Sequence, residues 1–249
     1  MPSYTFTPSI LRGAGTRAVP EIPAGSSFPN AFSLSFDGTD DIASGSLSDS
    51  SIHGSKTLSF WIKVTDMSQN QTVAQFQGSR SGDNFNIRIV SNRLDIGARG
   101  AAIHGKTTGT VDLSDWTHIL AIKNTTFSQG TVQRVYVNGV EISPSNVTVN
   151  SGLSNKVIIG KIGNIGYYGN TFGGQIDEIA IFDTELSGSV STIYNGGVPG
   201  DLTDLNPLLW YRCGDIVNAS GSNVPSQGSN ADGDLVLLNG ASFSTSVPT

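Results

Sequence analysis

Hydrophobic and polar residues alternate along most of the chain after about residue 30. The alternation is clearest at 58–64, where Leu58, Phe60, Ile62 and Val64 share one parity, and it recurs at 32–36, 85–89, 94–96 and 116–122. Successive side chains of an extended strand point to opposite faces, so this period predicts strands with one buried face and one face toward water. Trp61 has the opposite parity from Phe60 and Ile62, and we expect it to cover the other face of its sheet.

A β-hairpin is predicted at residues 134–142. Asn138-Gly139 separates two β-prone arms there, and Asn-Gly is the preferred two-residue hairpin turn because both central residues take positive φ. Further strands are predicted at 157–160, 208–211 and 235–238, and at 175–182, which is apolar on both parities and should be covered on both faces.

Helical spacing is found in the segment that runs from Asp183 to Tyr194. Leu186, Val190 and Ile193 fall on one face of a short helix, and Gly196-Gly197 closes it. Either Asp183 or Thr184 is expected to cap the N-terminus, and the two glycines to supply a left-handed C-terminal cap.

The composition favours one large domain. Turn residues, with 30 glycines and 10 prolines among 249 residues, are spread along the chain, and strands do not alternate with helices. The sequence therefore predicts an all-β, antiparallel two-sheet sandwich with one short helix. Residues 1–30 contain five prolines and predict an extended N-terminal arm, and residues 31–249 predict the sandwich, including a C-terminal strand and loop extension at about 200–249.

Charge and cysteine content exclude several classes of protein. The net charge is −6, opposite to that of a typical nucleic-acid-binding surface, and the single cysteine, Cys213, excludes intrachain disulfides and multi-cysteine zinc sites. Cys213 is expected to be a small core residue and His118 a packed structural histidine. No apolar run is long enough to span a membrane, and the first residues lack the pattern of a secretory signal.

Five ordered phrases carry a resemblance to laminin-G-like, concanavalin A-like jelly-roll domains. They are LSFDGTDD at 34–41, LSFWIK at 58–63, WTHI at 116–119, VYVNGV at 135–140 and GQIDEIAIF at 174–182. The resemblance covers about residues 32–197 and implies two curved antiparallel sheets that bind ligands on the concave face or at the rim loops.

The tail carries a second resemblance. The residues WYRCGD at 210–215 and PSQG at 225–228 resemble the ending of laminin-G-like proteins from marine bacteriophages. This resemblance implies a virion protein assembled in the host cytoplasm, attached to other virion proteins through its arm. Virion appendages are often oligomers, so a homo-oligomer is an expectation from this class alone.

Glycoside hydrolysis is the enzymatic activity to test, because jelly rolls include laminarinase-like enzymes with a Glu-x-Asp-x-x-Glu strand. The chain lacks that motif, and its neighbouring Asp177 and Glu178 point to opposite faces of a strand. We therefore expect a protein that is not an enzyme.

Calcium is the inorganic partner that the sequence favours. Asp37, Asp40 and Asp41 lie within five residues around a glycine turn, and a hard cation takes oxygen ligands. The resemblance implies that a structural calcium would join this turn to Asp177. An alternative is that Asp37 and Asp40 only cap the turn through hydrogen bonds from side chain to backbone.

A glycan site is predicted in the glycine-flanked loop 163–170. Tyr167 and Tyr168 could stack on sugar rings, and Asn164 and Asn170 could bind hydroxyl groups, although loop packing or a subunit contact is the alternative. The leading hypothesis is a non-enzymatic structural protein of a virus particle, such as a capsid decoration, fibre or appendage, that can adhere to glycans. The alternative is a free carbohydrate-binding lectin module, dependent on calcium or not.

Overall fold

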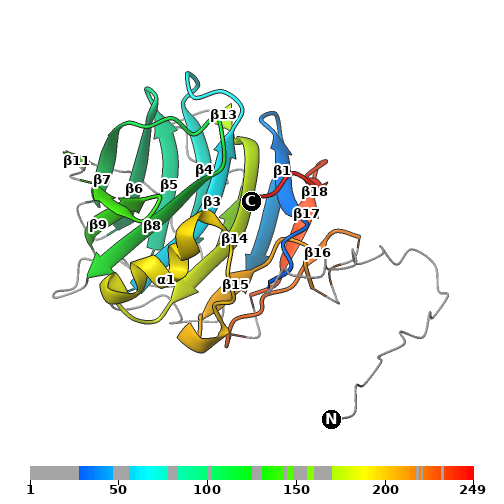
Figure 1. Ribbon diagram of the computed structural model, residues 1–249. Helices are drawn as coiled ribbons and strands as arrows, with labels where there is room; N and C mark the ends of the chain where they lie inside the picture. Colours follow the sequence, from blue (N-terminus) through cyan, green and yellow to red (C-terminus); the bar gives the residue numbers. More distant parts are fainter. Residues whose placement is uncertain are drawn as a thin grey trace, which may run out of the picture.

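The computed structural model describes residues 28–46, 56–77, 84–99, 103–124, 131–142, 145–147, 156–159, 170–216, 219, 221–230 and 233–249. Within these ranges the chain forms two large, mostly antiparallel sheets that pack face to face (Figure 1). The predicted two-sheet sandwich is confirmed. Most of the predicted arm, residues 1–27, lies outside the described residues.

Sheet A contains the strands formed by the five sequence phrases that carry the family resemblance. Its spatial order is β10 (Val140–Ile142), β9 (Thr131–Val137), β8 (Thr117–Asn124), β3 (Lys56–Val64), β14 (Gly173–Phe182), β1 (Ser33–Asp37) and β18 (Ser242–Ser244), and β15 (Leu209–Tyr211) also pairs with β14. The predicted hairpin turn is present between β9 and β10, because Asn138 and Gly139 have φ values of 48° and 76°.

Sheet B packs on the inner face of sheet A. Its spatial order is β11 (Ser145–Val147), β7 (Ile103–Thr110), β6 (Arg93–Arg99), β5 (Asn84–Val90), β4 (Gln71–Gln77), β12 (Lys156–Ile159), β2 (Ile42–Ser46), β17 (Leu235–Leu238) and β16 (Asn223–Val224). The short strand β13 (Asn170–Thr171) is parallel to β4, and the other pairings are antiparallel.

The main core lies between the sheets, and the alternate apolar residues that the sequence pattern predicted to be buried form it. Phe60 and Ile62 of β3 and Phe85 and Ile87 of β5 are fully buried in it. Cys213 is also a member of this core, as predicted, with 1% of its surface exposed. Burial of this apolar surface is the main stabilising contribution to such a sandwich.

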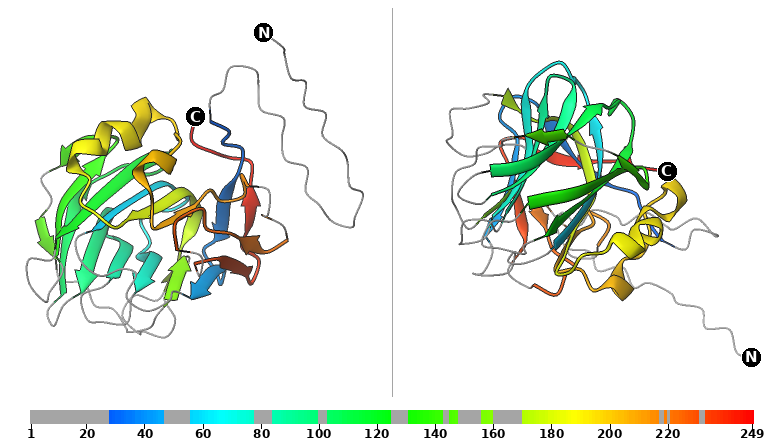
Figure 2. Two further views of the ribbon diagram at one scale, coloured as in Figure 1. Left: turned by 90° about the horizontal axis from the view of Figure 1, so that it is seen from below. Right: turned by 90° about the vertical axis from the view of Figure 1, so that its left-hand side faces the viewer.

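A second apolar cluster covers the outer face of sheet A. Leu120 and Ile122 of β8, with Ala180 and Phe182 of β14, pack there against Val190 and Ile193 of α1 (Val190–Tyr194). Figure 2 shows α1 on the side of sheet A that faces away from sheet B. Strand β14 is therefore covered on both faces, and Trp61 covers the outer face, as predicted, with its ring 6.0 Å from that of Tyr194.

The helical segment is shorter than predicted, and its start was predicted wrongly. A 3₁₀ turn at Ser187–Ser189 precedes α1, and further 3₁₀ turns follow at Asn195–Gly197 and Thr203–Leu205. Asp183 does not cap the helix because its carboxylate pairs with Lys56, and the Thr184 carbonyl accepts a hydrogen bond from Thr57. At the C-terminus, Asn195 takes the left-handed position ahead of the two glycines.

The chain after residue 200 completes both sheets. Strand β18 pairs with β1 at the edge of sheet A, and β17 pairs with β2 in sheet B. Strands β16 and β18 were not predicted, because each has at most three residues and they lie in polar sequence. Among the described residues, no helix is long and apolar enough to cross a membrane.

Candidate functional site

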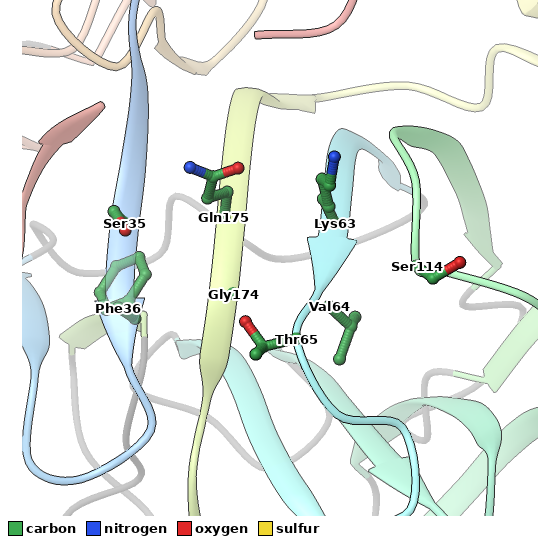
Figure 3. Close-up of a pocket in the computed structure, with 8 residues that line it drawn as sticks. All are labelled: Ser35, Phe36, Lys63, Val64, Thr65, Ser114, Gly174 and Gln175. Atoms are coloured by element: carbon green, nitrogen blue, oxygen red, sulfur yellow. The ribbon is translucent and has the colours of Figure 1, made fainter. Parts of the chain in front are cut away.

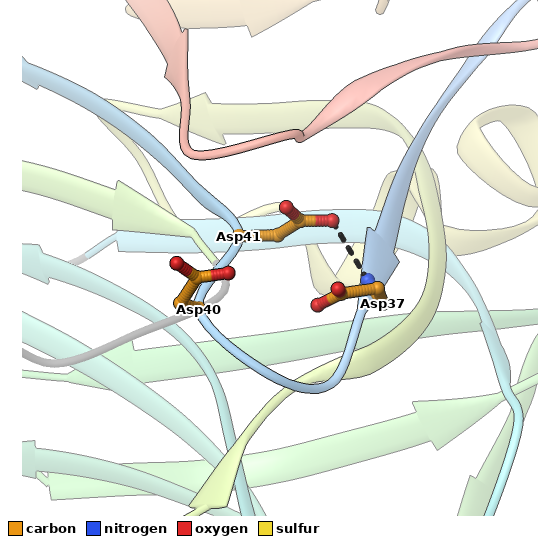
Figure 4. Close-up of side chains that lie close together, drawn as sticks. All are labelled: Asp37, Asp40 and Asp41. Carbon is orange, nitrogen blue, oxygen red and sulfur yellow. Dashed lines mark hydrogen bonds between the residues drawn. The ribbon is translucent and has the colours of Figure 1, made fainter.

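An acidic turn joins β1 to β2 at one end of the sandwich. The carboxylates of Asp37, Asp40 and Asp41 supply oxygen atoms that lie within 4.8 Å of one another (Figure 4). Gly38 makes the turn possible, since its φ is +83° and a Cβ there would lie 3.3 Å from the Cα of Gly173. The turn therefore packs closely against the start of β14.

Hydrogen bonds within the turn fix two of the carboxylates. The Thr39 N–H donates to Asp37 Oδ1 at 2.6 Å, and the Asp37 N–H donates to Asp41 Oδ2 at 2.8 Å. From the C-terminal extension, Asn239 donates its side-chain amide to the Asp40 carbonyl at 3.0 Å. Asp37 therefore makes the turn-capping hydrogen bond that the alternative requires, while Asp40 takes part through its backbone.

Asp41 is the buried member of this cluster, with 4% of its surface exposed, and its Oδ1 has no hydrogen-bond partner. Burial raises the pKa of Asp41, and the negative charges of Asp37 and Asp40 raise it further. A buried carboxylate oxygen without a partner, beside two exposed carboxylates, is a donor set that suits a hard divalent cation. These residues therefore fit calcium chemistry.

Asp177, the fourth predicted ligand, lies apart from this turn. In the register of β1 and β14, Asp37 is opposite Gly173, which is four residues before Asp177. Four residues of strand span about 13 Å, beyond the reach of one ion's ligand shell. The structure thus brings together Asp37, Asp40 and Asp41 and leaves Asp177 in a buried position, with none of its surface exposed.

A hollow of about 270 Å³ borders the acidic turn. Asp37, Gly38, Thr65, Asp66, Gln69, Gln71, Thr171 and Gly173 line it. Gln71 joins its walls, because its Oε1 accepts a hydrogen bond from Gly173 N at 2.9 Å and its Nε2 donates to the Asp66 carbonyl. The lining residues offer carboxylates, amides and hydroxyl groups.

A second hollow of about 390 Å³ lies next to it and shares Thr65 (Figure 3). Ser35 on β1, Gln175 on β14 and Lys63 on β3 lie side by side across the sheet in one row. Lys63 also approaches Asp115 at 3.4 Å. Gly174 lets the strands approach here, because a Cβ at this position would meet the Lys63 carbonyl at 2.3 Å. We call the 37–41 turn and these two hollows the acidic rim.

The predicted glycan loop cannot be placed. Asn164, Tyr167 and Tyr168 lie outside the described residues, and of Asn170 only the backbone is described. The chain enters this segment from Ile159, opposite Ala74 of β4, and leaves it at Asn170, opposite Gln71 of the same strand. Since Gln71 and Thr171 line the smaller hollow, the segment ends at the acidic rim.

Among the residues whose side chains the structure describes, three groups suited to acid–base or nucleophilic chemistry are enclosed. His118 has none of its surface exposed, its Nε2 lies 2.9 Å from Ser59 Oγ, and burial lowers its pKa to about 3. Glu178 is held by Trp210 Nε1 at 2.6 Å and by Arg212 Nε at 3.2 Å. Burial also raises the pKa of the Cys213 thiol well above its usual value. These side chains serve packing and buried hydrogen bonding.

Sequence reasoning missed several lining residues of the acidic rim, namely Lys63, Thr65, Asp66, Gln71 and Ser114. One local signal was available: Asp66 and Ser68 have the spacing of an aspartate turn, and the Ser68 N–H donates to Asp66 Oδ1 at 2.8 Å. The others lie at the end of β3 (Lys63, Thr65), at the first residue of β4 (Gln71) and between β7 and β8 (Ser114), so only the folded chain brings them together.

Comparison with known proteins agrees with the fold. Two solved structures show the same architecture. A candidate carbohydrate-binding protein from Bacteroides ovatus has a TM-score of 0.62 at 14% identity, and the match covers 88% of this chain but 62% of that one. The chain thus spans less than two thirds of that protein. A heptameric SAP-like pentraxin from Limulus polyphemus has a TM-score of 0.51 at 14% identity, with 87% and 96% of the two chains covered.

Sequence comparison identifies the family. No curated protein matches the chain. Residues 36–189, however, match the laminin-G-like family that is described as the concanavalin A-like lectin/glucanases superfamily. The matched range includes β1 from its fourth residue to the end of β14, together with the acidic turn. The chain therefore belongs to the laminin-G-like family of the concanavalin A-like lectin/glucanase superfamily.

Proposed function

We propose that this protein is a non-enzymatic carbohydrate-binding module that binds its ligand at the acidic rim. The observation that carries the proposal is the juxtaposition of three carboxylates with two hollows, of about 270 and 390 Å³, that are lined mostly by residues with polar side chains. Sugars present many hydroxyl groups, and the acidic rim offers carboxylates, amides and the Lys63 ammonium as hydrogen-bonding partners.

The family supports a binding role. Lectins are named in the description of the matched superfamily, and the similar Bacteroides ovatus structure is described as that of a candidate carbohydrate-binding protein. The same superfamily includes glucanases, which need two carboxyl groups flanking a glycosidic bond. In this chain Glu178, a carboxyl group of the GQIDEIAIF phrase, is buried and bound to Trp210 and Arg212, which favours binding over hydrolysis.

The carboxylates of Asp37, Asp40 and Asp41 would hold a calcium ion. When bound, the ion supplies a positive charge that attracts hydroxyl or carboxylate oxygens of a ligand. Asp41 contributes its unpartnered Oδ1 and keeps its hydrogen bond from Asp37 N through Oδ2. Glycan binding is then expected to depend on calcium.

A glycan array tests this proposal directly. The protein is applied with calcium and with chelator, beside Asp40→Asn and a control, Asp201→Asn. Asp201 is an exposed turn aspartate outside the acidic rim, and its Oδ1 accepts a hydrogen bond from Thr203 N at 2.9 Å. We expect selective binding that Asp40→Asn and the chelator weaken and the control does not. A wild-type protein that binds no glycan would refute the proposal.

The tyrosine loop provides a second test of the same activity. Since the chain enters and leaves this segment beside β4, Tyr167→Ala and Tyr168→Ala should each weaken binding to any glycan found on the array. Unchanged binding in both variants would exclude the tyrosines from the site. Activity of the wild-type protein on β-glucans would contradict the non-enzymatic part of the proposal.

We further propose that the module works on a virus particle, as a capsid decoration, fibre or appendage attached through its N-terminal arm. The phage-like phrases of the tail and the proline-rich arm support this setting. Deletion of residues 1–27 spares Phe28 and Asn30, which contact the sandwich through Trp210 and the Pro248 carbonyl. The deletion should abolish association with the particle and leave the fold intact. A folded deletion variant that still associates would refute the role of the arm.

A further inference from the structure

Two carboxyl groups of β14 are buried next to the chain that precedes β1, residues 28–32, which we call the strap. Asp177 and Glu178 are 0% and 3% exposed. They lie at a β-bulge, where Glu178 has a φ of 46°, in the left-handed region that residues with a side chain rarely adopt. Backbone strain of this kind is concentrated at functional and switching positions, so the buried pair calls for a role beyond packing.

The strap contacts this pair directly and through a third carboxyl group. Asn30 of the strap interacts with the carboxyl group of Asp177. The N–H groups of Ala31 and Phe32 donate to Asp215 Oδ2 at 3.0 and 3.2 Å. Asp215 in turn interacts electrostatically with both carboxyl groups of β14. The strap is therefore held against a cluster of three carboxyl groups.

The guanidinium of Arg212 joins the other end of the strap to the same cluster. It donates to Glu178 Oε1 at 3.2 Å and to the Pro29 carbonyl, and it lies 4.0 Å from the ring centroid of Phe28. Phe28 also stacks on Trp210, whose Nε1 donates to Glu178 at 2.6 Å. Movement of the strap would thus uncover the cluster and admit water to it.

Two unpaired oxygen atoms lie between the strap and β14. Asp177 Oδ2 and Asn30 Oδ1 are buried, and neither has a hydrogen-bond partner. Both atoms only accept hydrogen bonds while Asp177 is ionised. A proton on Asp177 turns one of these acceptors into a donor, and the neighbouring Asn30 offers the other as its acceptor. The unpaired oxygens therefore indicate a carboxyl group that is protonated when the strap is closed.

Negative charge exceeds positive charge in the cluster. When all are ionised, Asp215 and the two carboxyl groups of β14 carry three negative charges, and Arg212, on which Asp201 also acts, supplies one positive charge. The Cys213 thiol is neutral, because burial and the nearby carboxylates raise its pKa well above its usual value. The strap has no titratable side chain, and neither has Trp61, which β3 places opposite the cluster. Buried charges without a counter-charge are costly, so the closed strap favours protonated carboxyl groups.

We infer that the strap is controlled by protons: it stays closed while Asp177 and Glu178 hold protons and opens when they release them. Burial raises the pKa of Glu178 to about 7 and that of Asp177 well above its usual value. Opening admits water and returns both pKa values toward their ordinary range, so it releases protons and is favoured as the pH rises through 7. This switch is independent of glycan binding and controls how the N-terminal end of the described chain is held.

Amide hydrogen exchange of the wild-type protein, followed by NMR at pH 5 and pH 8, measures this opening. The N–H groups of Ala31 and Phe32 report on the strap, and that of Leu94, which donates to Thr108 Oγ1 at 3.0 Å, reports on the core. After correction for intrinsic exchange, the opening constant of the strap should rise at least about tenfold from pH 5 to pH 8. At pH 8 it should exceed that of Leu94 by at least about tenfold. An opening constant that does not rise overturns the inference, and so does one equal to that of Leu94, because the strap would then open only when the whole protein unfolds.

Neutral variants identify the groups that hold the protons. The double variant Asp177→Asn with Glu178→Gln keeps the shapes of both side chains and should make strap opening independent of pH. Glu178→Gln alone, the milder change, should reduce the rise. Glu141→Gln is the matched control, since Glu141 also pairs with an arginine, with Arg134 Nε 3.6 Å from its Oε1, but lies on β10. The control should keep the wild-type rise. A full rise in the double variant or in Glu178→Gln would show that other groups hold the protons, and would overturn the inference.

Discussion

Two acidic clusters lie at different positions along the same pair of strands, β1 and β14, and their surroundings differ. At the acidic rim, Asp37 and Asp40 are exposed and only Asp41 is buried. Further along β14, Asp177 and Glu178 are 0% and 3% exposed, and Asp215 acts electrostatically on both. The first cluster can meet a ligand from solution, whereas the second is part of the interior.

The interior carboxylates have partners within the protein. Arg212 Nε lies 3.2 Å from Glu178 Oε1, and its guanidinium lies over the ring of Phe28, 4.0 Å from the ring centroid. Asp215 Oδ2 accepts hydrogen bonds from the N–H groups of Ala31 and Phe32 at 3.0 and 3.2 Å. The C-terminal extension thus fastens the chain that enters β1.

The difference shows how burial separates binding from structural roles among similar carboxylates. A buried carboxylate needs a counter-charge or a proton, and Arg212 supplies the charge for Glu178. The exposed carboxylates of the acidic rim keep their charge in water and remain available to a cation.

The largest effect is expected from Arg212→Met. The variant leaves Glu178 buried without its counter-charge, and breaking such a pair costs about 3–5 kcal/mol. Denaturant unfolding at pH 8 should show a loss of about that size in the free energy of unfolding. The loss should be smaller at pH 5, where Glu178 is protonated and needs no partner. An equal loss at both pH values would contradict the electrostatic explanation.

A smaller effect is expected from pH acting on Glu178. Burial raises the pKa of Glu178 to about 7, although the positive charge of Arg212 lowers it. Burial also raises the pKa of Asp177. The folded state then holds a proton that the unfolded state releases, so acidification through pH 7 stabilises the fold. This gain in stability is complete when the pH has fallen to the pKa of Glu178 in the unfolded chain, near 4.5.

Comparison of the wild type with Glu178→Gln isolates this contribution. His118, whose pKa burial lowers to about 3, destabilises the fold below its usual pKa of 6.5, but it does so in both proteins. The wild type should therefore gain on the order of 2 kcal/mol over Glu178→Gln between pH 8 and pH 5. A difference that stays constant with pH would show that Glu178 has an ordinary pKa in the fold.

Most of the sandwich could be predicted because its signals are local. The period-2 apolar pattern of 58–64 identified the central strand of sheet A, and Asn138-Gly139 identified its hairpin. Strands β16 and β18 could not be predicted, because a segment of two or three residues with one apolar side chain becomes a strand only when a neighbouring edge is there to pair with. The helix cap was predicted wrongly for a similar reason: Asp183 pairs with Lys56, which lies on a strand far away in the sequence.

The candidate site could be predicted only where it is contiguous in sequence. Asp37, Asp40 and Asp41 lie in one turn and were found together, whereas Lys63, Gln71 and Ser114 reach the acidic rim through three separate segments. Asp177 has the residue type of a ligand but the wrong position, and its distance from the turn depends on the register of β1 and β14. Register is set by the whole sheet.

Calcium is expected to act on the carboxylates of the acidic rim and not on the buried cluster. A cation that binds only the folded protein stabilises it by about 1.4 kcal/mol at ten times its dissociation constant. Thermal unfolding with calcium should therefore shift the midpoint upward by a few degrees relative to chelator. Asp40→Asn should remove the shift and Asp201→Asn should keep it. Mass determination in the same solution shows whether the shift comes from a change of oligomeric state.

The smallest effect is expected from Asp41→Asn in the presence of chelator. The pKa of Asp41 is raised because burial and the charges of Asp37 and Asp40 make its ionised form less favourable than it is in water. An asparagine removes that charge, and its side-chain oxygen can still accept the hydrogen bond from Asp37 N. Without calcium the variant should be as stable as the wild type, or more stable by up to about 1 kcal/mol. With calcium the wild type should be the more stable protein, because only the wild type is stabilised by the ion. A variant that is less stable under both conditions would mean that Asp41 only holds the turn.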